Sequence, residues 1–565
     1  MACLSAFGLG CSSVSAQTAN DLQQRSQDQE RRAQEALEQI QKAITTPDVR
    51  LQKEASSPAS RRLADEAPCF PIQELALPPE SMRQWSWLLG HADGHTTLDK
   101  PDTVLGRCIG AQGVQTVIDR LQNALIARGF VTSRILAGPQ NLQTGQLTLQ
   151  VLPGRIQEVR WANGSGQRGS RWNIVPVKSG DVLNLRDIEQ ALENYKRVPT
   201  AEADIDIEPA KEPGYSNLVI RYGQALPFRL SAGMDDSGSR STGKLQGNAT
   251  LSYDNWWTLS DLFYVSLSSD LGGGDPGHRG TRSMATHYSV PFGYWLVSFN
   301  ASRNRYFQTV AGATQDYLYS GNSRQQDIKL TQLFARDAFS KTSWSVKAFA
   351  RQSENFIDDT EVEVQRRRVG GYELGLQHKA EWGQLGIDGA LAYKRGIKAF
   401  GANEAPEELF GEGTHQFKLW TADLQWQIPF SMAGQSWNYQ GNWRWQDNQT
   451  PLTPQDRFSI GGRYTVRGFD GESSLAGESG WLVRNELSTA IAQTGHRLYL
   501  ALDHGRVSGL SAQNLVGQSL TGFVLGLKGK VGALQYDVFA GSPVKKPQGF
   551  RAANTTAGIS LSAQF

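Results

Sequence analysis

Apolar and polar residues alternate along the chain from about residue 224 to the C-terminus, in segments of about ten residues separated by Gly, Asn, Asp and Ser. In the segment 245–253, for example, Leu, Gly, Ala, Leu and Tyr occupy odd positions, and Gln, Asn, Thr and Ser occupy even ones. A β-strand between lipid and a water-filled lumen needs apolar residues on one face only. The 342 residues from position 224 have room for about 16 strands, at roughly 21 residues per strand and loop. The pattern therefore predicts a transmembrane antiparallel β-barrel over 224–565.

A soluble β-sandwich or propeller also alternates, so the end of the chain decides between these interpretations. Ile559, Leu561, Ala563 and the terminal Phe565 share one parity, and Ser or Gln stands between them. A terminal aromatic residue on an alternating strand resembles the signal that the outer-membrane assembly machinery reads. We therefore favour the membrane barrel and expect Phe565 to be its assembly signal.

Two small α/β units precede the alternating region. The segment 68–151 shows the pattern strand, helix, helix, strand, strand, and its second helix is predicted over 114–128, where apolar residues recur at helical spacing. The segment 152–223 repeats this organisation with a strand, a helix over 185–197 and a two-stranded hairpin. We expect two tandem α/β domains of about 70–85 residues each.

The N-terminal part of the chain predicts a helix and a linker. Residues 20–44 contain no Gly or Pro and are rich in Gln, Glu, Arg and Ala, so they should form a helix that ends before Pro47. Its apolar stripe is thin, which fits either a frayed, solvated helix or a helix inside a polar, water-filled lumen. The segment 46–67 is rich in Pro, Ser, Ala and charged residues and is interpreted as a flexible linker.

Composition excludes two classes of protein. The 565 residues include 57 Lys and Arg against 55 Asp and Glu, a formal net charge of +2, and no basic patch is visible. Nucleic acid is therefore not expected as a partner. No run approaches the roughly 18 apolar residues of a membrane-spanning helix. Gly 58, Trp 15, Tyr 16 and Phe 22 suit the turns and aromatic girdles of a β-rich protein.

The cysteines and the first residues indicate export. Two of the four cysteines lie within 1–16, and Cys69 and Cys108 form an isolated pair further on, which predicts a single disulfide in an oxidising compartment. Residues 1–16 are mostly small and apolar and end in Val-Ser-Ala, as a signal peptide does before cleavage. A lipoprotein signal at Cys11 is the weaker alternative, because Gly8 occupies the place of an aliphatic residue.

Nothing in the sequence predicts an enzyme, a cofactor or a metal site. The segment 238–244 matches most of a phosphate-binding loop, but Leu245 replaces the Ser or Thr that would hold magnesium, and a strand follows where a helix is required. The segment 272–277 contains GxGxxG without the strand-turn-helix context. Both segments are predicted to be turns. HExxH and GxSxG motifs are absent, and the eight His have no ligand spacing.

One polar constellation remains within the predicted barrel. A glycine-flanked Arg467 lies in the segment 461–469, and strand parity turns Arg484, Glu486 and Asp503 toward the lumen. The planar guanidinium of Arg467 can therefore bind two inward carboxylates, Glu486 and Asp503. The alternative is an ordinary surface-loop arginine. A barrel held by a closed ladder should survive loss of such a contact, so we expect Arg467 substitutions to impair activity more than folding.

These residues resemble the two-partner-secretion transporters of the bacterial outer membrane, the hemolysin activator/secretion family of ShlB, FhaC, HecB and CdiB type. The resemblance covers essentially the whole chain after the leader. The most specific motif is the loop tip Val466-Arg467-Gly468-Phe469. Further motifs lie at 69–70, 106–110, 128–132, 145–147, 183–194, 484–487 and 502–507.

The resemblance implies an architecture and an activity. It implies an N-terminal plug helix (17–45), a linker (46–67), two periplasmic POTRA domains (68–151, with the Cys69–Cys108 disulfide, and 152–223) and a 16-stranded barrel (224–565) whose pore loop is 461–480. It also implies export of a large, unfolded exoprotein, which the POTRA domains recognise and the barrel threads to the cell surface. The candidate recognition residues in the POTRA motifs are Arg128, Thr132, Arg186 and Gln190.

The implied partners are the N-terminal secretion domain of the exoprotein, outer-membrane lipid and, during biogenesis, the outer-membrane assembly machinery. Two alternatives remain open: an assembly factor, which typically carries more POTRA domains and no plug helix, and a passive porin, which needs no periplasmic domains. The cargo is also open among contact-dependent-inhibition toxins, hemolysins and adhesins.

Overall fold

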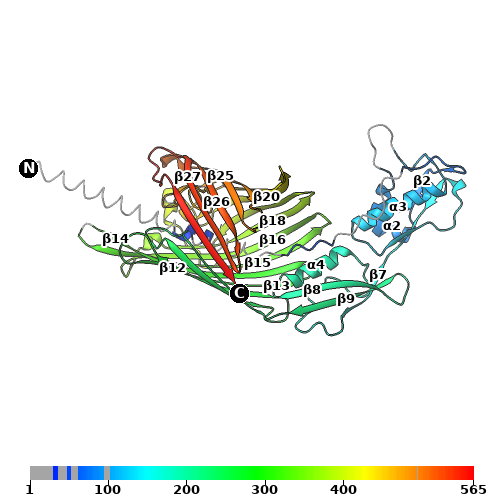
Figure 1. The fold of residues 1–565 in the computed structure, drawn as a ribbon, viewed down its shortest axis with the longest axis horizontal. Coiled ribbons are helices and arrows are strands. Elements are labelled where there is room, and N and C mark those ends of the chain that lie inside the picture. Colours follow the sequence, from blue (N-terminus) through cyan, green and yellow to red (C-terminus); the bar gives the residue numbers. More distant parts are fainter. Residues whose placement is uncertain are drawn as a thin grey trace, which may run out of the picture.

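The computed structural model describes residues 29–32, 34–35, 47–51, 62–94, 102–312, 314–492 and 494–565. The predicted signal peptide and most of the predicted N-terminal helix lie outside these residues. Figure 1 shows a large β-barrel with two small domains extending from one of its ends, the more N-terminal domain farther from the barrel. This arrangement confirms the predicted fold class.

The barrel is antiparallel and closed, because its first strand pairs with its last, for example Ala232 with Ala563. Sixteen strands of eight or more residues form the wall among the described residues, and the two-residue β17 extends one hairpin. The strands are β10 Phe228–Asp235, β11 Leu245–Asp254, β12 Leu262–Gly272, β13 Arg279–Phe292, β14 Trp295–Ala311, β15 Asp316–Arg336, β16 Ser340–Ile357, β17 Thr360–Glu361, β18 Arg367–Trp382, β19 Leu385–Ile397, β20 Lys418–Met432, β21 Gln435–Asn448, β24 Ser479–Ala490, β25 Arg497–Ser508, β26 Ser519–Val531, β27 Leu534–Lys545 and β28 Thr556–Gln564. Short 3-10 helices in its connections are η3 Glu363–Gln365, η4 Pro406–Phe410, η5 Pro454–Asp456 and η6 Ser511–Asn514.

The two faces of the wall follow the predicted parity. On β25, Leu498, Leu500 and Leu502 expose 42%, 44% and 51% of their surface on the outside. Tyr499 and Asp503, at the other parity, are buried on the inside. The outer surface is therefore apolar and the lumen carries the polar groups, as a bilayer requires.

The C-terminal residue takes part in closing the barrel. The backbone N–H of Phe565 donates to the carbonyl of Leu230 at 2.8 Å, and the N–H of Leu230 donates to the carbonyl of Phe565 at 3.2 Å. The Phe565 side chain remains exposed. Its role as an assembly signal stays a prediction.

The second small domain lies next to the barrel. Its sheet has the order β7-β9-β8, from β7 Arg155–Trp161, β8 Ala201–Pro209 and β9 Tyr215–Gln224, and the helix α4 Leu185–Lys196 packs on it. The side chain of Asn184 caps α4 by accepting a hydrogen bond from the N–H of Arg186 at 2.9 Å. Buried Ile188, Leu192 and Tyr195 fix the inner face of this helix on the domain core.

The first small domain contains three two-stranded sheets and a long helix. Its elements are β1 Phe70–Pro71, β2 Glu74–Ala76, α2 Pro79–Trp85, η1 Ser86–His91, β3 Cys108–Ile109, α3 Ala111–Ala127, β4 Arg134–Leu136, η2 Leu142–Thr144, β5 Gln146–Thr148 and β6 Gln150–Leu152. The disulfide Cys69–Cys108 is present, with a Cα–Cα distance of 5.2 Å, which confirms the prediction. In the described ranges, no helix is long and apolar enough to cross a bilayer.

The first domain begins earlier than the predicted boundary at residue 68. Leu63 is buried in its hydrophobic core. The helix α3 has no cap from its own preceding residue, and the carboxylate of Glu66 instead accepts hydrogen bonds from the N–H groups of Gly110, Gln112 and Gly113 at 2.7–2.9 Å. Residues 62–67 therefore belong to the domain and not to a flexible linker.

Candidate functional site

A hairpin between β21 and β24 leaves the barrel wall and folds into the lumen. Its base is the antiparallel pair β22 Phe458–Ile460 and β23 Leu475–Gly477, and its tip lies within the predicted pore loop 461–480. Apolar side chains of the hairpin pack against inward side chains of the wall. This cluster contains Ile460, Val466, Phe469, Leu475, Leu482, Val507, Ala512, Leu520 and Phe550.

The structure brings Arg467 together with both carboxylates that sequence parity had turned inward. Its Nε and Nη2 donate to the two carboxylate oxygens of Asp503 at 2.7 and 3.0 Å, and its Nη1 donates to Glu486 at 2.7 Å. The backbone N–H of Arg467 donates to Asp503 at 3.0 Å as well. Asp503 is fully buried and Arg467 is 8% exposed. We call Arg467, Glu486 and Asp503 the loop ion cluster.

Two further cations, Arg484 and Lys528, lie next to the carboxylates of the loop ion cluster. The Nε of Arg484 lies 3.7 Å from Asp503, and its Nη1 donates to the carbonyl of Tyr464 at 3.2 Å. Lys528 of β26 pairs with Glu486. Strand parity predicted the inward position of Arg484. Lys528 was not predicted, although it lies directly opposite Arg497 and so faces the lumen as Asp503 does.

The glycine after Arg467 allows the loop tip to touch the wall backbone to backbone. Gly468 has φ +90°, and a Cβ there would lie 2.7 Å from the carbonyl oxygen of Ser542 and 2.9 Å from that of Phe523. Phe469 then packs edge-on against Phe550, with ring centroids 5.9 Å apart. The four residues 466–469 thus supply an apolar anchor, a charge, a close approach and an aromatic contact in succession.

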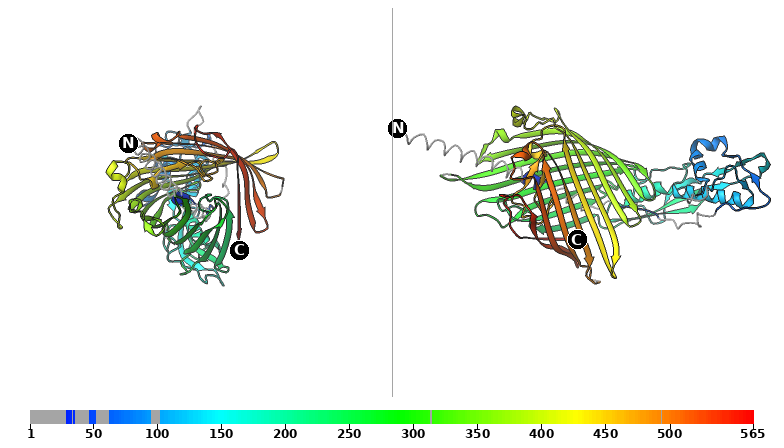
Figure 2. Two further views of the ribbon diagram at one scale, coloured as in Figure 1. Left: turned by 90° about the vertical axis from the view of Figure 1, so that its left-hand side faces the viewer. Right: turned by 90° about the horizontal axis from the view of Figure 1, so that it is seen from above.

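The described part of the N-terminal helix lies in the lumen, inside the ring of barrel strands (Figure 2). The Nε2 of Gln29 donates to the hydroxyl of Ser239 at 2.7 Å, and the hydroxyl of Thr242 donates to the Oε1 of Gln29 at 3.1 Å. For these residues, the lumen interpretation is the correct one of the two that the thin apolar stripe left open. The segment 238–244 is a turn, as predicted, and serves as a support for this helix.

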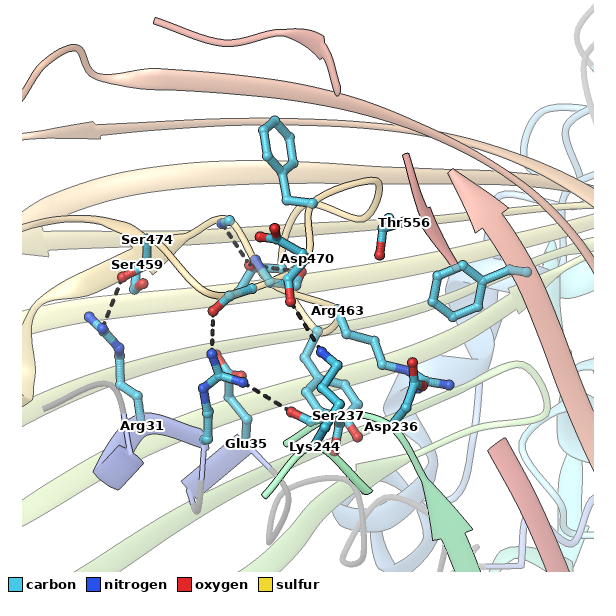
Figure 3. Close-up of a pocket in the computed structure, with 18 of the residues that line it drawn as sticks. Arg31, Glu35, Asp236, Ser237, Lys244, Ser459, Arg463, Asp470, Ser474 and Thr556 are labelled. Atoms are coloured by element: carbon cyan, nitrogen blue, oxygen red, sulfur yellow. Dashed lines mark hydrogen bonds and ion pairs between the residues drawn. The ribbon is translucent and has the colours of Figure 1, made fainter. Parts of the chain in front are cut away.

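The same helical residues contact the pore loop. Arg31 donates to the hydroxyl of Ser474 at 3.1 Å, and Arg32 donates to the carbonyl of Ser237 at 3.1 Å and to that of Gly471. Figure 3 shows Arg31 pointing to Ser474, with the loop and the β10–β11 turn on neighbouring sides of the helix. Helix and loop therefore contact each other and together occupy part of the lumen.

The loop is also tied to the wall where the barrel closes. Arg463 pairs with Asp236 at 2.6 Å and donates to the carbonyl of Ile559 on β28 at 3.2 Å (Figure 3). Lys244 donates to the carbonyl of Asp470 at 3.4 Å. These contacts were not predicted, because the partners lie more than 90 residues apart and two of the acceptors are backbone carbonyls.

Cavities remain on two sides of the loop tip. One of about 500 Å³ is lined by Gln29, Tyr464 and Arg467, among others, and one of about 390 Å³ is lined by Arg467, Arg484 and Glu486. Arg467 lines both. The helix and the loop tip therefore stand between open parts of the lumen.

The four predicted recognition residues differ in their surroundings. Arg128 lies over the ring of Trp87 at 3.7 Å, and Thr132 has a buried hydroxyl without a hydrogen-bond partner among the described residues. Arg186 and Gln190 of α4 are buried, Arg186 in an ion pair with Glu189 and Gln190 against Gly293 and Arg336 of the barrel. In the state described, the last two are therefore not open to a peptide.

The helix α4 docks on the turn between β13 and β14. Gln190 and Asn194 donate to the carbonyl of Gly293 at 3.2 and 2.8 Å. Tyr294 donates to the carboxylate of Asp187 at 2.5 Å. Burial raises the pKa of Asp187. The second domain is therefore fixed to the barrel mouth by polar contacts of its helix.

A closed barrel with a helix and a re-entrant loop in its lumen and two small α/β domains at one end defines an outer-membrane transporter with periplasmic POTRA domains. Residues 214–529 match the family described as haemolysin secretion/activation protein ShlB/FhaC/HecB. Residues 96–154 match the ShlB-type POTRA domain, and residues 155–209 match the POTRA domain. The chain belongs to the haemolysin secretion/activation protein ShlB/FhaC/HecB family.

Individual relatives agree with this assignment. The outer membrane transporter CdiB-2 of Burkholderia pseudomallei is 37% identical over 517 residues, which cover 89% of this chain and 88% of the relative. The hemolysin transporter protein ShlB of Serratia marcescens is 26% identical over 509 residues, 87% of each chain. The solved structure of CdiB from Acinetobacter baumannii has a TM-score of 0.82 at 29% identity, and the match covers 96% of this chain and 99% of that one.

Proposed function

We propose that the protein exports one large, unfolded partner exoprotein across the outer membrane, through the lumen that the N-terminal helix and the pore loop occupy. The exoprotein is of the contact-dependent-inhibition or hemolysin type, since relatives along most of the chain are named CdiB and hemolysin transporters. The observation that carries the proposal is that the lumen is occupied by two segments held by side-chain contacts rather than by wall strands.

The energies of these contacts suit a plug that leaves and returns. Gln29 and Arg32 each make two hydrogen bonds to groups of the turn and the loop, and Arg31 donates to Ser474. Each contributes on the order of 0.5–1.5 kcal/mol, and bonds to a charged group contribute somewhat more. Such contacts hold a helix in place and can be exchanged for contacts with water or with a passing chain. The wall is held by a closed backbone ladder and stays intact meanwhile.

Recognition of the exoprotein is proposed to use the POTRA domains. Both β7 and β8 are edge strands of the second domain's sheet. An unfolded chain can add to such an edge by β-augmentation, which uses backbone hydrogen bonds and tolerates many sequences. Of the candidate residues, Arg128 and Thr132 belong to the first POTRA domain. Arg186 and Gln190 become accessible once α4 separates from the barrel.

Two further partners belong to the same proposal. The apolar belt of the wall, including Leu498, Leu500 and Leu502, faces outer-membrane lipid. The last strand, β28, and the Phe565 that follows it are read by the outer-membrane assembly machinery. The change Phe565→Ala should then lower the amount of assembled barrel without changing export per assembled molecule.

Secretion tests the proposal directly. The chain is co-expressed with the N-terminal secretion domain of the exoprotein encoded beside it, and that domain is measured in the culture medium. We expect secretion by the parent chain and its loss in Arg467→Ala, with equal amounts of heat-modifiable barrel in both. A well-assembled parent barrel that secretes nothing would refute export and would favour a porin or an assembly factor.

A further inference from the structure

Residues 47–51 of the predicted linker are bound between α4 and the barrel. The N–H of Val49 donates to Glu193 at 2.8 Å, and the N–H of Leu51 donates to Glu189 at 2.9 Å. The carbonyl of Val49 accepts from Arg336, the last residue of β15, at 2.5 Å. Two carboxylates and a guanidinium thus bind alternate backbone groups, as a neighbouring strand would. The flexible linker expected over 46–67 is therefore wrong for residues 47–51.

The side chains of this segment are recognised too. Val49 and Leu51 pack against the hydrophobic core of the second POTRA domain. Asp48 pairs with Lys341 at 2.8 Å and with Lys379 at 3.2 Å. Residues 47–51 therefore carry a short motif of an acidic, an apolar, a basic and a second apolar residue, and we call them the latch segment.

The basic residue of the motif binds the barrel. Arg50 donates to the carbonyl of Phe339 in the β15–β16 turn at 2.6 Å and lies 3.6 Å from Glu381. Burial raises the pKa of Asp48, but its hydrogen bonds to Arg50 and Lys341 and the nearby lysine charges outweigh this effect and hold the pKa well below its usual range. Each of the four residues of the motif thus has its own contact.

The site is built independently of the segment that fills it. Arg336 pairs with Glu189 at 3.1 Å and with Glu193 at 2.9 Å, and Arg186 binds Glu189 at 2.6 Å. The side chains of Glu189 and Arg336 are 0% and 3% exposed. These charges therefore neutralise one another when the segment leaves, and the backbone-binding geometry persists. A cavity of about 220 Å³, lined by Glu193 and Lys341, adjoins the site on the lumen side.

We propose that the latch segment is a tethered ligand that keeps the helix in the lumen, and that an extended segment of the exported chain displaces it from the same site. The recognised segment is an extended polypeptide with two free N–H groups two residues apart, apolar side chains at both positions and a carboxylate just before them. This inference rests on the proposed export function for the identity of the displacing chain. The latch itself does not depend on it.

The tether acts through effective concentration. The latch segment starts twelve positions after Glu35, the last described helical residue. While the latch segment is bound, the helix remains within a short chain length of its binding site in the lumen and rebinds readily. When the segment leaves, the tether lengthens and the open state lasts longer. Occupation of a site at the mouth is thereby coupled to opening of the pore, without contact between the two.

The first test changes only the latch segment in the full chain. The double variant Val49→Asp/Leu51→Asp removes the apolar contacts of the latch segment with the second POTRA domain. The matched control is Asp206→Lys, which alters an exposed ion pair of that domain. Open-state occupancy is measured as conductance in planar bilayers. Accessibility of the helix is measured as maleimide labelling of Gln34→Cys in a chain whose Cys3 and Cys11 are Ser.

We expect the double variant to raise occupancy and labelling rate about ten-fold, which corresponds to about 1.4 kcal/mol, and the control to match the parent. Parental values for the double variant would overturn the latch. The measurement needs no exoprotein, so failure of export leaves it intact: a parent that never secretes while the double variant opens would refute the proposed function alone.

The second test addresses the site as a binding site. A capped peptide of residues 46–52 is added on the POTRA side of the parent protein, and the matched control peptide carries N-methyl groups on the amides of Val49 and Leu51. We expect the first peptide to raise conductance and the methylated one to have no effect, because it lacks the two donors for Glu193 and Glu189. Equal effects of both peptides, or of neither, would overturn displacement by an extended chain.

Discussion

Removal of the Arg467 side chain separates the function of the pore loop from the integrity of the barrel. Arg467→Ala deletes the hydrogen bonds of the guanidinium to Asp503 and Glu486. The wall strands that carry these carboxylates stay paired with each other, Arg484 opposite Asp503 and Glu486 opposite Ala501. The change therefore weakens the contacts that hold the loop against the wall and leaves the backbone hydrogen bonds between the wall strands unaltered.

The magnitude follows from burial. Orphaning one partner of a buried ion pair costs about 3–5 kcal/mol. Asp503 is fully buried, but it keeps the backbone N–H of Asn485 at 3.3 Å and the charge of Arg484 at 3.7 Å. We therefore place the cost at the lower end, about 3 kcal/mol, which shifts the ratio of seated to displaced loop by about two orders of magnitude.

Two measurements report on the loop and the barrel separately. Proteolysis of the loop in native membranes should become fast in Arg467→Ala, and secretion should be lost, while the heat-modifiable band of the folded barrel is unchanged. Arg467→Lys keeps the charge without the planar, bidentate geometry. Its loop protection and secretion should therefore lie between those of the parent and those of Arg467→Ala. The matched control is Arg444→Ala, which breaks a partly solvated lumen pair with Asp423 at 3.6 Å and should behave like the parent.

Two results would refute this reasoning. If Arg467→Ala lost the folded band, the loop ion cluster would be needed for assembly, and the independence of wall and loop would be wrong. If Arg467→Ala kept both loop protection and secretion, the apolar contacts of Val466 and Phe469 would be sufficient to seat the loop.

Three further changes have defined outcomes. Gly468→Ala forces a Cβ to within 2.7 Å of a wall carbonyl and should expose the loop to protease, whereas Gly462→Ala, whose Cβ meets nothing closer than 3.9 Å, should not. Glu66→Gln should speed hydrogen exchange of the α3 amides by weakening the cap, a loss of about 1 kcal/mol. Burial raises the pKa of Glu66, but three backbone N–H groups lower it below the ordinary value of 4.5. In the parent the cap is therefore complete above about pH 4.5 and is lost as pH falls through the lowered pKa; protection of the α3 amides, corrected for intrinsic exchange, that does not fall when Glu66 becomes protonated would contradict this. Replacing Cys69 and Cys108 by Ser opens a link of 39 residues and should cost the first POTRA domain ~4 kcal/mol without affecting the barrel, and an unshifted melting transition of that domain would contradict it.

Strand parity explains why much of the site could be predicted. The period of two fixes the face of every residue once one lipid-facing residue is known, so Glu486 and Asp503 could be turned inward without a structure. The glycine beside Arg467 marked the tip of a turn. The predicted meeting of one loop arginine with two carboxylates needed no distance information, because adjacent strands place inward residues side by side.

The contacts of the N-terminal helix and of the latch segment could not be predicted in this way. Gln29 meets Ser239 across 210 positions, and Val49 meets Arg336 across 287. Gln, Ser and short acidic-apolar stretches occur throughout soluble proteins, so no local pattern singles these out. For α4, the motif suggested recognition residues, but the face that carries Gln190 is covered by the barrel, and amphipathicity alone does not say which neighbour a helix face meets.

The lumen contacts and the latch contacts share no residue, and this separation has an energetic consequence. Gln29, Arg31 and Arg32 bind the loop and the β10–β11 turn, whereas Val49 and Leu51 bind α4 and the end of β15. Contributions of sites without common partners add. The lumen contacts and the latch contacts together can therefore keep the resting pore closed more firmly than either set alone. A chain that displaces the latch segment lowers the barrier to opening, while the pore loop remains bound to the wall through Arg467.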